Sequence, residues 1–331
     1  MSPHQNRPSP LPQLILLSAI FSAALSLSLS STLKSTGQAS LKTSSPQFSN
    51  INSNSHSPLP HPCTQQHALY SNFLHQVKQE NFDAHGFGIE KIWLKAAHQY
   101  TQGFRYLPNG DILESTGIYG KSHLQYLRPD TCGTGFHIVR SDRESLKSEL
   151  FGEGADVIRM GSGKKYVFQL TWKNRRIFVY EARNLKWFRT LWMPRKIGQG
   201  WGLTSNPETR QIYVTNGSSS VFLCQASLTK DAQGLSKVKF RCDNGNPVKM
   251  PGSQTGPSNL NEFEYRDNSL YTNEYMTDNI HKINAKNFTV SRTWDMAALR
   301  AFTNKLLAKE NSNALKNDEV LNGITWDPKA G

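Results

Sequence analysis

A loose repeat with a period near fifty residues constrains the fold of this chain more than any other feature. Five stretches begin with Gln, Glu or Asn, usually followed by Gly, and continue into an apolar run, a turn and, except in the last, a second apolar run. They start at Gln102, Glu153, Gln199, Asn261 and Asn322, which are 51, 46, 62 and 61 residues apart. Short runs of Ile, Val, Tyr, Phe and Trp between Gly, Asn, Asp and Pro are typical of strands. A strand-only repeat of this length predicts a β-propeller, in which each repeat forms one small sheet around a central axis.

The number of repeats predicts an all-β fold with five blades over residues 86–331. Equivalent positions in a propeller face the same axis, so the four amides and one acid that begin the repeats should converge at one end of it. The alternative is that these side chains satisfy backbone groups of turns and never meet.

The fifth repeat departs from this regular pattern in two ways. Residues 294–317 are rich in Ala, Leu and Lys, and the spacing of Met296, Leu299, Phe302 and Leu306 predicts a helical insertion before that repeat. The sequence then stops at Gly331, a few residues into the repeat, so we expect the last blade to be incomplete here and the propeller domain to be C-terminally truncated. Residues 88–96 are a candidate for one outer strand that helps to close the ring.

The N-terminal part of the chain has a different composition. Residues 11–29 are an apolar run without charge, which predicts a secretory signal peptide or a signal anchor within residues 1–30. Residues 31–85 are a linker and poorly ordered lead-in rich in Ser, Asn and Pro, a composition that cannot bury a core. We therefore expect entry into the secretory pathway, as a secreted, vacuolar or membrane-anchored protein.

Four cysteines are an even number in a chain that is expected to meet an oxidising compartment. Cys224 ends the strand-like SVFLC and Cys242 ends the strand-like KVKFRC, so a hairpin between them predicts a disulfide. The cysteine spacings do not fit a zinc knuckle. Asn216 and Asn287 begin glycosylation sequons, and the first of them lies in a predicted tight turn.

The charge balance is basic, with 38 Lys and Arg against 25 Asp and Glu, a formal net charge of +13. Such a balance suits nucleic acid or an anionic membrane. The basic residues are scattered, however, and the densest run, KNRR at 173–176, is predicted to be a hairpin turn. We therefore interpret the charge as a general surface property and expect no nucleic-acid partner.

Seven short motifs follow one another from about Gly88 to the end of the chain: YTQGFRYL, ILESTGIYGKS, FGEG, FQLTW, GWGLT, LNEFEY and LNGITWD. In this order they resemble the plant and bacterial glutaminyl-peptide cyclotransferases, the glutaminyl cyclases of the papaya-latex type. The resemblance implies a five-bladed β-propeller that converts the N-terminal glutamine of peptides and proteins to pyroglutamate and releases ammonia. It also implies that no cofactor and no catalytic metal take part, and we expect a monomer.

The resemblance also assigns roles to individual residues. Glu153 matches the acid of the FxEG motif and is the implied proton shuttle, and Asn261 is the implied oxyanion donor. The implied substrate-binding residues are Tyr100, Gln102, Phe151, Trp172, Trp201, Tyr275 and Asn322. Tyr275 stands where the family usually has Trp, and a family lysine proposed to assist oxyanion binding falls beyond Gly331.

Two other functions are compatible with a propeller of this kind. In a metal-dependent hydrolase of the lactonase sort, Glu153, Asn261 and Asn322 would be metal ligands, although one carboxylate compensates little of the charge of a divalent cation. A non-catalytic propeller would bind peptides or partner proteins on its loop face.

Overall fold

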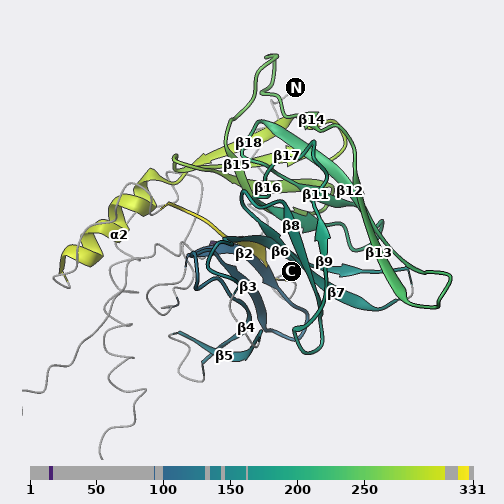
Figure 1. Ribbon diagram of the computed structural model, residues 1–331. Coiled ribbons are helices and arrows are strands. Elements are labelled where there is room, and N and C mark those ends of the chain that lie inside the picture. The colour runs from purple at the N-terminus through teal and green to yellow at the C-terminus, as the bar shows by residue number, and fades with distance from the viewer. Residues whose placement is uncertain are drawn as a thin grey trace, which may run out of the picture.

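The computed structural model describes residues 15–17, 93, 100–130, 135–142, 146–161, 163–309 and 320–327. In this part of the chain, four antiparallel sheets of four or five strands follow one another along the sequence, as Figure 1 shows. Each sheet is built from consecutive hairpins, so the strands lie side by side in sequence order, except that the short β14 pairs with β12. The sheets are the blades of an all-β propeller, and we number these four blades 1 to 4.

Each blade begins with its innermost strand. Blade 1 comprises β2 (Thr101–Tyr106), β3 (Ile112–Thr116), β4 (Leu124–Pro129) and β5 (Phe136–Ser141). Blade 2 comprises β6 (Gly152–Arg159), β7 (Lys165–Thr171), β8 (Arg176–Glu181) and β9 (Lys186–Trp192). Blade 3 comprises β10 (Leu203–Ser205), β11 (Ile212–Val214), β12 (Ser220–Lys230), β13 (Ser236–Cys242) and β14 (Asn246–Pro247). Blade 4 comprises β15 (Leu260–Arg266), β16 (Ser269–Glu274), β17 (Asn279–Asn284) and β18 (Val290–Asp295).

The blades are held together by apolar side chains between neighbouring sheets. Strands of alternating pattern place one set of residues on each face, and buried clusters lie between blades 1 and 2, between blades 2 and 3 and between blades 3 and 4. Phe168 and Ile177 of blade 2, for example, belong to the same buried cluster as Val214 of blade 3. Each fully buried side chain of this kind contributes about 1.5–3 kcal/mol to stability, so the ring of blades is held chiefly by these interfaces.

One further strand lies beside the inner strands. β19 (Ile324–Trp326) contacts β2 of blade 1 and β15 of blade 4, and the yellow strand beside the label of β2 in Figure 1 shows its place near the centre. Tyr106 N in β2 donates a hydrogen bond to Thr325 Oγ1 at 2.7 Å, and Asn273 Nδ2 in β16 donates one to Leu321 O at 2.6 Å. β19 therefore bridges the first and fourth blades.

β19 also pairs antiparallel with β1 (Ile15–Leu17). Most of the predicted signal segment and all of the predicted linker, residues 31–85, lie outside the described residues, as does most of the candidate strand 88–96. Trp93 is described, and its ring lies 5.8 Å from that of Phe136 in β5, at the outer strand of blade 1.

A helix, α2 (Ala297–Lys309), follows blade 4 within the span where helical spacing predicts one. It lies to one side of the sheets in Figure 1. Leu299 and Phe302 are buried, whereas the predicted first residues of the helix, Trp294 and Asp295, belong to β18 instead. Among the described residues, no helix is long and apolar enough to cross a membrane.

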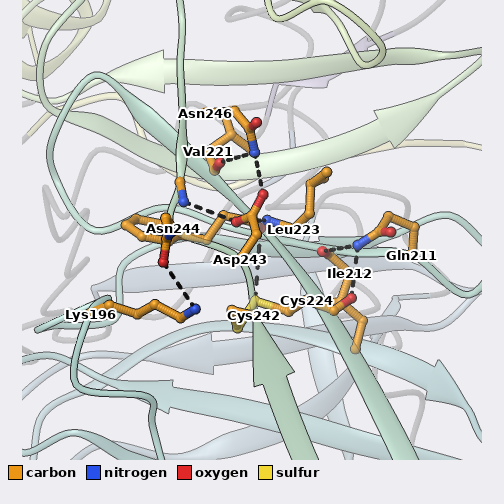
Figure 2. Close-up of a disulfide and its surroundings, with 12 residues drawn as sticks. Lys196, Gln211, Ile212, Val221, Leu223, Cys224, Cys242, Asp243, Asn244 and Asn246 are labelled. Carbon is orange, nitrogen blue, oxygen red and sulfur yellow. Dashed lines mark hydrogen bonds between the residues drawn. A yellow bond between two sulfur atoms is a disulfide. The ribbon is translucent and has the colours of Figure 1, made fainter.

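The structure confirms the predicted disulfide between Cys224 and Cys242, which lie opposite each other in β12 and β13 with Cα atoms 4.0 Å apart (Figure 2). The prediction that Cys224 ends its strand is wrong, because β12 continues to Lys230. Next to the bridge, the Asp243 carboxylate accepts a hydrogen bond from Leu223 N at 3.0 Å, which fixes the end of this hairpin. Cys63 and Cys132 lie outside the described residues.

Candidate functional site

Three of the five repeat starts lie at the same kind of irregularity in their inner strands. β2, β6 and β15 each have one residue more than the partner strand, at Gln102, at Glu153–Gly154 and at Asn261–Glu262 respectively. A bulge of this kind interrupts the alternation of side chains and re-aims the extra residue. The repeat therefore places Gln102, Glu153 and Asn261 at equivalent bulges of blades 1, 2 and 4, at one end of the axis.

Close backbone contacts between the inner strands identify the equivalent position in blade 3. A Cβ atom added to Gly103 would overlap Ala155 N, one added to Gly154 would overlap Trp201 O, and one added to Gly202 would overlap Asn261 O. Each glycine follows the residue at the axis and lets the next blade approach closely. Trp201, which precedes Gly202, thus occupies in blade 3 the place that Glu153 has in blade 2.

The prediction that Gln199 joins this group is wrong. Gln199 lies two residues before the equivalent position, and its Nε2 donates to Asn216 O at 3.3 Å. The stretch QGWG contains two Gly residues, each preceded by a candidate for the axial position. The first lies against β7 of blade 2, and only the second lies against the inner strand of the next blade, at Asn261 O. The axial group therefore contains three amides, one acid and one indole.

The three amides form a hydrogen-bonded line. Asn261 Nδ2 donates to Asn322 Oδ1 at 3.3 Å, and Asn322 Nδ2 donates to Gln102 Oε1 at 2.7 Å and to Thr101 O at 2.9 Å. Asn261 and Asn322 are both buried. The structure thus brings together amides that are 220 and 61 residues apart in the sequence, as the repeat predicts.

Glu153 is buried in β6 between two glycines. Its backbone oxygen accepts a hydrogen bond from Ser115 Oγ at 2.5 Å, which fixes the bulge to blade 1. Burial raises the pKa of the Glu153 carboxyl well above its ordinary value. Neither Gly152 nor Gly154 has a positive φ, so both are needed for reasons of space. A Cβ atom on Gly152 would lie 2.6 Å from Thr116 O, and one on Gly154 would lie 2.5 Å from Trp201 O.

Aromatic residues lie close to Glu153 along the backbone: Phe151 precedes it by two residues, and Gly154 N donates to Trp201 O at 2.7 Å. The rings of Phe151 and Trp172 meet edge to face at 5.8 Å, and those of Trp201 and Tyr275 do so at 5.5 Å. Such edge-to-face pairs hold each other in fixed orientations. Four of the predicted aromatic residues therefore form two pairs, one from blade 2 and one between blades 3 and 4.

A further aromatic residue escaped the sequence-based prediction. The Tyr119 ring meets Phe151 edge to face at 5.3 Å and extends the first pair. Gly117 lies between this pair and the amides, because a Cβ atom there would overlap both the Phe151 ring and Gln102 Cγ. Its amide donates to the backbone oxygen of Tyr100 at 2.8 Å, so Tyr100 also lies beside Gln102. The motif ILESTGIYGKS contains both Gly117 and Tyr119, but nothing local indicates which of its residues reach the axis.

A second polar layer, which we call the floor, lies three residues further along the inner strands. Arg105 of β2 forms ion pairs with Glu264 of β15 and, at 3.5 Å, with Asp156 of β6. Ser205 Oγ donates to the other oxygen of Asp156 at 2.6 Å. Burial opposes the charge of Arg105, but Glu264 and Asp156 outweigh it, so its pKa lies above the ordinary value. Burial raises the pKa of Glu264 to about 7 although Arg105 acts against it.

Comparison with known proteins decides the family of this chain. A family model described as glutamine cyclotransferase matches residues 71–331. The chain belongs to the glutamine cyclotransferase family. This confirms the resemblance carried by the seven motifs.

One curated relative agrees with that assignment, and one solved structure shares the fold of this glutamine cyclotransferase-family chain. Glutaminyl-peptide cyclotransferase from Arabidopsis thaliana is 28% identical over 232 residues, which are 69% of this chain and 60% of the relative. The chain thus spans about 60% of the length of that protein. The crystal structure of the Myxococcus xanthus glutaminyl cyclase has a TM-score of 0.52 at 23% identity and covers 72% of this chain and 86% of its own, so the two chains share a fold.

Glu262 is a further buried carboxyl of this family member that the sequence did not single out. It takes the place beside the axis that Gly103, Gly154 and Gly202 have in the other blades. One carboxyl oxygen accepts from Phe104 N at 3.4 Å, while Oε2 is buried and has no hydrogen-bond partner among the described residues. Burial, reinforced by the charges of neighbouring acids, raises the pKa of Glu262 well above its ordinary value. The signal in the sequence is the Glu in LNEFEY at the repeat position that is otherwise Gly.

The indole N–H of Trp201 is also buried without a hydrogen-bond partner within the described part of the chain. Gly217 lies against the ring, because a Cβ atom there would lie 2.5 Å from it. A buried, unpaired donor is costly, which makes the Trp201 N–H available to a ligand at the axis. Among the described residues, no three His, Cys, Asp or Glu side chains are grouped so that they could hold a metal ion.

Proposed function

We propose that this protein is a glutaminyl-peptide cyclotransferase, which converts the N-terminal glutamine of peptides and proteins to pyroglutamate and releases ammonia. The observation that carries the proposal is the isolated acid of the axial group. Glu153 is buried at the bulge of blade 2 that is equivalent to those of Gln102 and Asn261, and burial is the one cause of its raised pKa. Membership of the glutamine cyclotransferase family supports the same reaction.

The reaction needs a group that carries one proton. The α-amine of the substrate forms a bond to the carbon of its own side-chain carboxamide, and the bond from that carbon to the amide nitrogen breaks as ammonia leaves. Because both groups belong to one residue, holding them in register removes much of the entropic barrier. Glu153 takes the proton from the attacking amine and gives it to the leaving nitrogen, and a raised pKa suits an acid that must do both near neutral pH.

The amide and indole donors have complementary tasks. Asn261 uses one N–H of its side chain to reach Asn322 and keeps the other for the oxyanion of the tetrahedral intermediate. The unpaired N–H of Trp201 is a second donor for that oxygen. Gln102 and Asn322 hold the carboxamide, and the remaining aromatic residues exclude water around it. These are Tyr100, Phe151, Trp172 and Tyr275.

We also infer that the propeller has five blades and that β19 is the innermost strand of the fifth. Two observations support this: β19 contacts both β2 and β15, and Asn322 joins the amide line as the repeat start of a fifth blade should. On this view α2 is a helical insertion between the fourth and fifth blades.

We propose that the protein enters the secretory pathway and is glycosylated there. A signal peptide or anchor within residues 1–30 would take the protein into the secretory pathway, where the Cys224–Cys242 disulfide is stable. Of the two sequons, Asn287 is exposed, whereas Asn216 uses its Nδ2 to donate to Ile197 O at 2.8 Å. We therefore propose Asn287 as the glycosylated residue and a monomer as the active form.

The decisive experiment is incubation of the purified protein with a Gln-Xaa dipeptide, followed by measurement of released ammonia and of the matching mass loss. Ring closure well above the spontaneous rate is expected, and its absence would contradict the proposal. Turnover should persist after thorough chelation, whereas loss with a chelator and recovery with a divalent cation would favour the hydrolase alternative. The structure gives that alternative little support, because Asn322 Oδ1 already accepts from Asn261 Nδ2 at 3.3 Å and from Gly323 N at 3.1 Å.

A further inference from the structure

Blade 2 carries a row of cations and indoles at the same end as Glu153. In this antiparallel sheet the start of β6, the end of β7, the start of β8 and the end of β9 lie at one edge, as the pairs Gly152 with Thr171 and Arg176 with Trp192 show. The β7–β8 turn and the segment after β9 therefore extend outward from the axis at the end where Glu153 lies. We call the following side chains the radial track: Trp172, Lys173, Arg175, Arg176, Trp192, Arg195 and Lys196.

Stacking orders the cations of the track on its indoles. Lys173 Nζ lies 3.9 Å from the centre of the Trp172 ring, and the Arg176 guanidinium lies 3.2 Å from that of Trp192. Contacts of this kind stabilise a charged side chain over the face of an aromatic ring. Trp192 nevertheless keeps 63% of its surface exposed, at the rim of the blade. The track thus begins at the aromatic pair beside Glu153 and ends on an exposed indole.

The outer end of the track is tied to blade 3. Lys196 Nζ donates to Asn244 Oδ1 at 3.3 Å, which Figure 2 shows beside the disulfide hairpin. Arg175 is anchored in a similar way, because its Nη2 donates to Met193 O at 3.1 Å. Both contacts are to neutral oxygens, so the positive charges remain uncompensated.

The charge of the track is one-sided. Among the described residues, none of its five cations forms an ion pair with a carboxylate. The single acid in residues 164–197 is Glu181, which ends β8 at the opposite edge of the blade. A group of like charges without compensation attracts an anionic ligand and speeds its association.

We propose that the radial track binds an acidic segment that directly follows the N-terminal glutamine of the substrate. This inference rests on the proposed cyclotransferase function, because it takes the glutamine itself to lie beside Glu153. The chain that continues from that glutamine leaves the axis along blade 2, where the track offers cations for carboxylates and indole faces for the backbone. The favoured substrates are accordingly peptides and proteins with Asp or Glu shortly after an N-terminal Gln.

The geometry of a sheet sets the distance along the peptide. Neighbouring strands are about 4.8 Å apart, so β9 lies roughly 14 Å from β6. An extended peptide advances about 3.4 Å per residue, so it covers this distance in about four residues. Acidic residues at about the third to fifth positions of the substrate, counting the glutamine as the first, should meet Arg176 and Arg195.

The test compares three peptides that differ only at the third to fifth positions, where they carry Glu, Gln or Lys. We expect kcat/KM for the acidic peptide to exceed that for the neutral one by about tenfold at low ionic strength, mostly through KM, with the basic peptide the poorest. The advantage should shrink at about 0.5 M salt because exposed charges are then screened. Equal kcat/KM for all three peptides would overturn the inference.

Two matched double variants locate the effect. Arg176→Glu with Arg195→Glu should abolish or invert the preference for the acidic peptide. Arg183→Glu with Lys186→Glu should preserve it, because both residues are exposed at the opposite edge of the blade, in the β8–β9 turn and at the start of β9. Both make the same change of net charge, so an equal loss of preference in both would show a general field effect and contradict the track.

Two further outcomes would contradict the inference. If the wild-type protein cyclises none of the three peptides, nor a Gln-Gly dipeptide, the proposed function fails and this inference with it. If the Arg176 and Arg195 variants keep the peptide preference but lose sedimentation with vesicles of anionic phospholipid, the surface serves a membrane and the peptide inference is wrong.

Discussion

The axial group and the floor are two polar layers on the same inner strands, and they differ in whether a cation lies beside their acids. In the axial group the other members are three amides and an indole, and no cation pairs with Glu153 among the described residues. In the floor Asp156 and Glu264 share Arg105. Three residues along a strand separate a carboxyl that is left free to exchange a proton from carboxylates that are held in ion pairs.

The difference indicates which layer takes part in the proposed reaction and which one stabilises the fold. A cation beside a buried acid favours its charged form, as Arg105 does for Glu264 although burial still raises that pKa to about 7, whereas a buried acid without one favours the neutral form. Perturbed carboxyls cluster at functional sites, although ion-pair networks perturb them too. The contrast predicts that changes in the axial group alter turnover, and that changes in the floor alter stability.

The largest expected effect is that of Glu153→Gln. The amide keeps the size of the side chain but cannot take up and return a proton, so kcat should fall by a factor of about a thousand. Because the neutral form is favoured by burial, the unfolding free energy should stay the same or rise slightly. Turnover of a Gln-Xaa peptide and urea unfolding measure the two quantities, and unimpaired turnover would place the proton route elsewhere.

Arg105→Met should lower stability rather than turnover. It leaves Asp156 and Glu264 buried without their cation, which should lower the unfolding free energy by about 3 kcal/mol near neutral pH. The pKa of Glu264, about 7, exceeds the ordinary value of 4.5, so its contribution to stability is fully present below about pH 4.5 and is lost as the pH rises through about 7. Without Arg105 that pKa rises further.

Urea unfolding at about pH 5.5 and about pH 8 therefore checks this floor variant, which should lose more stability than the wild type between the two values. A variant that is as stable as the wild type at both would show that the floor does not hold the blades together. Arg189→Met, at an exposed position of β9, is the matched control and should change neither value.

The sequence alone predicts much of this contrast, but only where local pattern suffices. Hairpins and apolar alternation are local, so the blades and the axial places of Gln102, Glu153 and Asn261 follow from the repeat. The choice between Gln199 and Trp201 does not, because it depends on which glycine touches Asn261 O, 59 residues after Gly202. Glu262 was missed for the same reason, since its burial comes from strands of other blades.

Trp201→Phe tests the donor of the axial group that the repeat misplaced. The phenyl ring keeps the edge-to-face contact with Tyr275 but lacks the N–H, so kcat should fall by about tenfold while stability changes little. Burying the unpaired N–H costs the wild type free energy, so the variant should be at least as stable. An unchanged kcat would leave Asn261 as the sole oxyanion donor, and Trp187→Phe, at an exposed indole, controls for a general effect of the substitution.

The smallest expected effect is that of Glu262→Gln, the residue between the two layers. Burial, together with the charges of Glu264, Glu153 and Asp156, raises the pKa of Glu262 well above its ordinary value, which favours its neutral form. The amide oxygen of Gln can still accept from Phe104 N, and activity should stay within about threefold of the wild type.

Stability responds differently, because a raised pKa means that the contribution of Glu262 is lost as the pH rises through that value. Gln does not titrate, so the variant should lose less stability than the wild type as the pH rises above the ordinary carboxyl pKa of 4.5. A loss of turnover as large as that of Glu153→Gln would show instead that Glu262 carries the proton itself, and that the boundary between the two layers lies one residue deeper than the axial group.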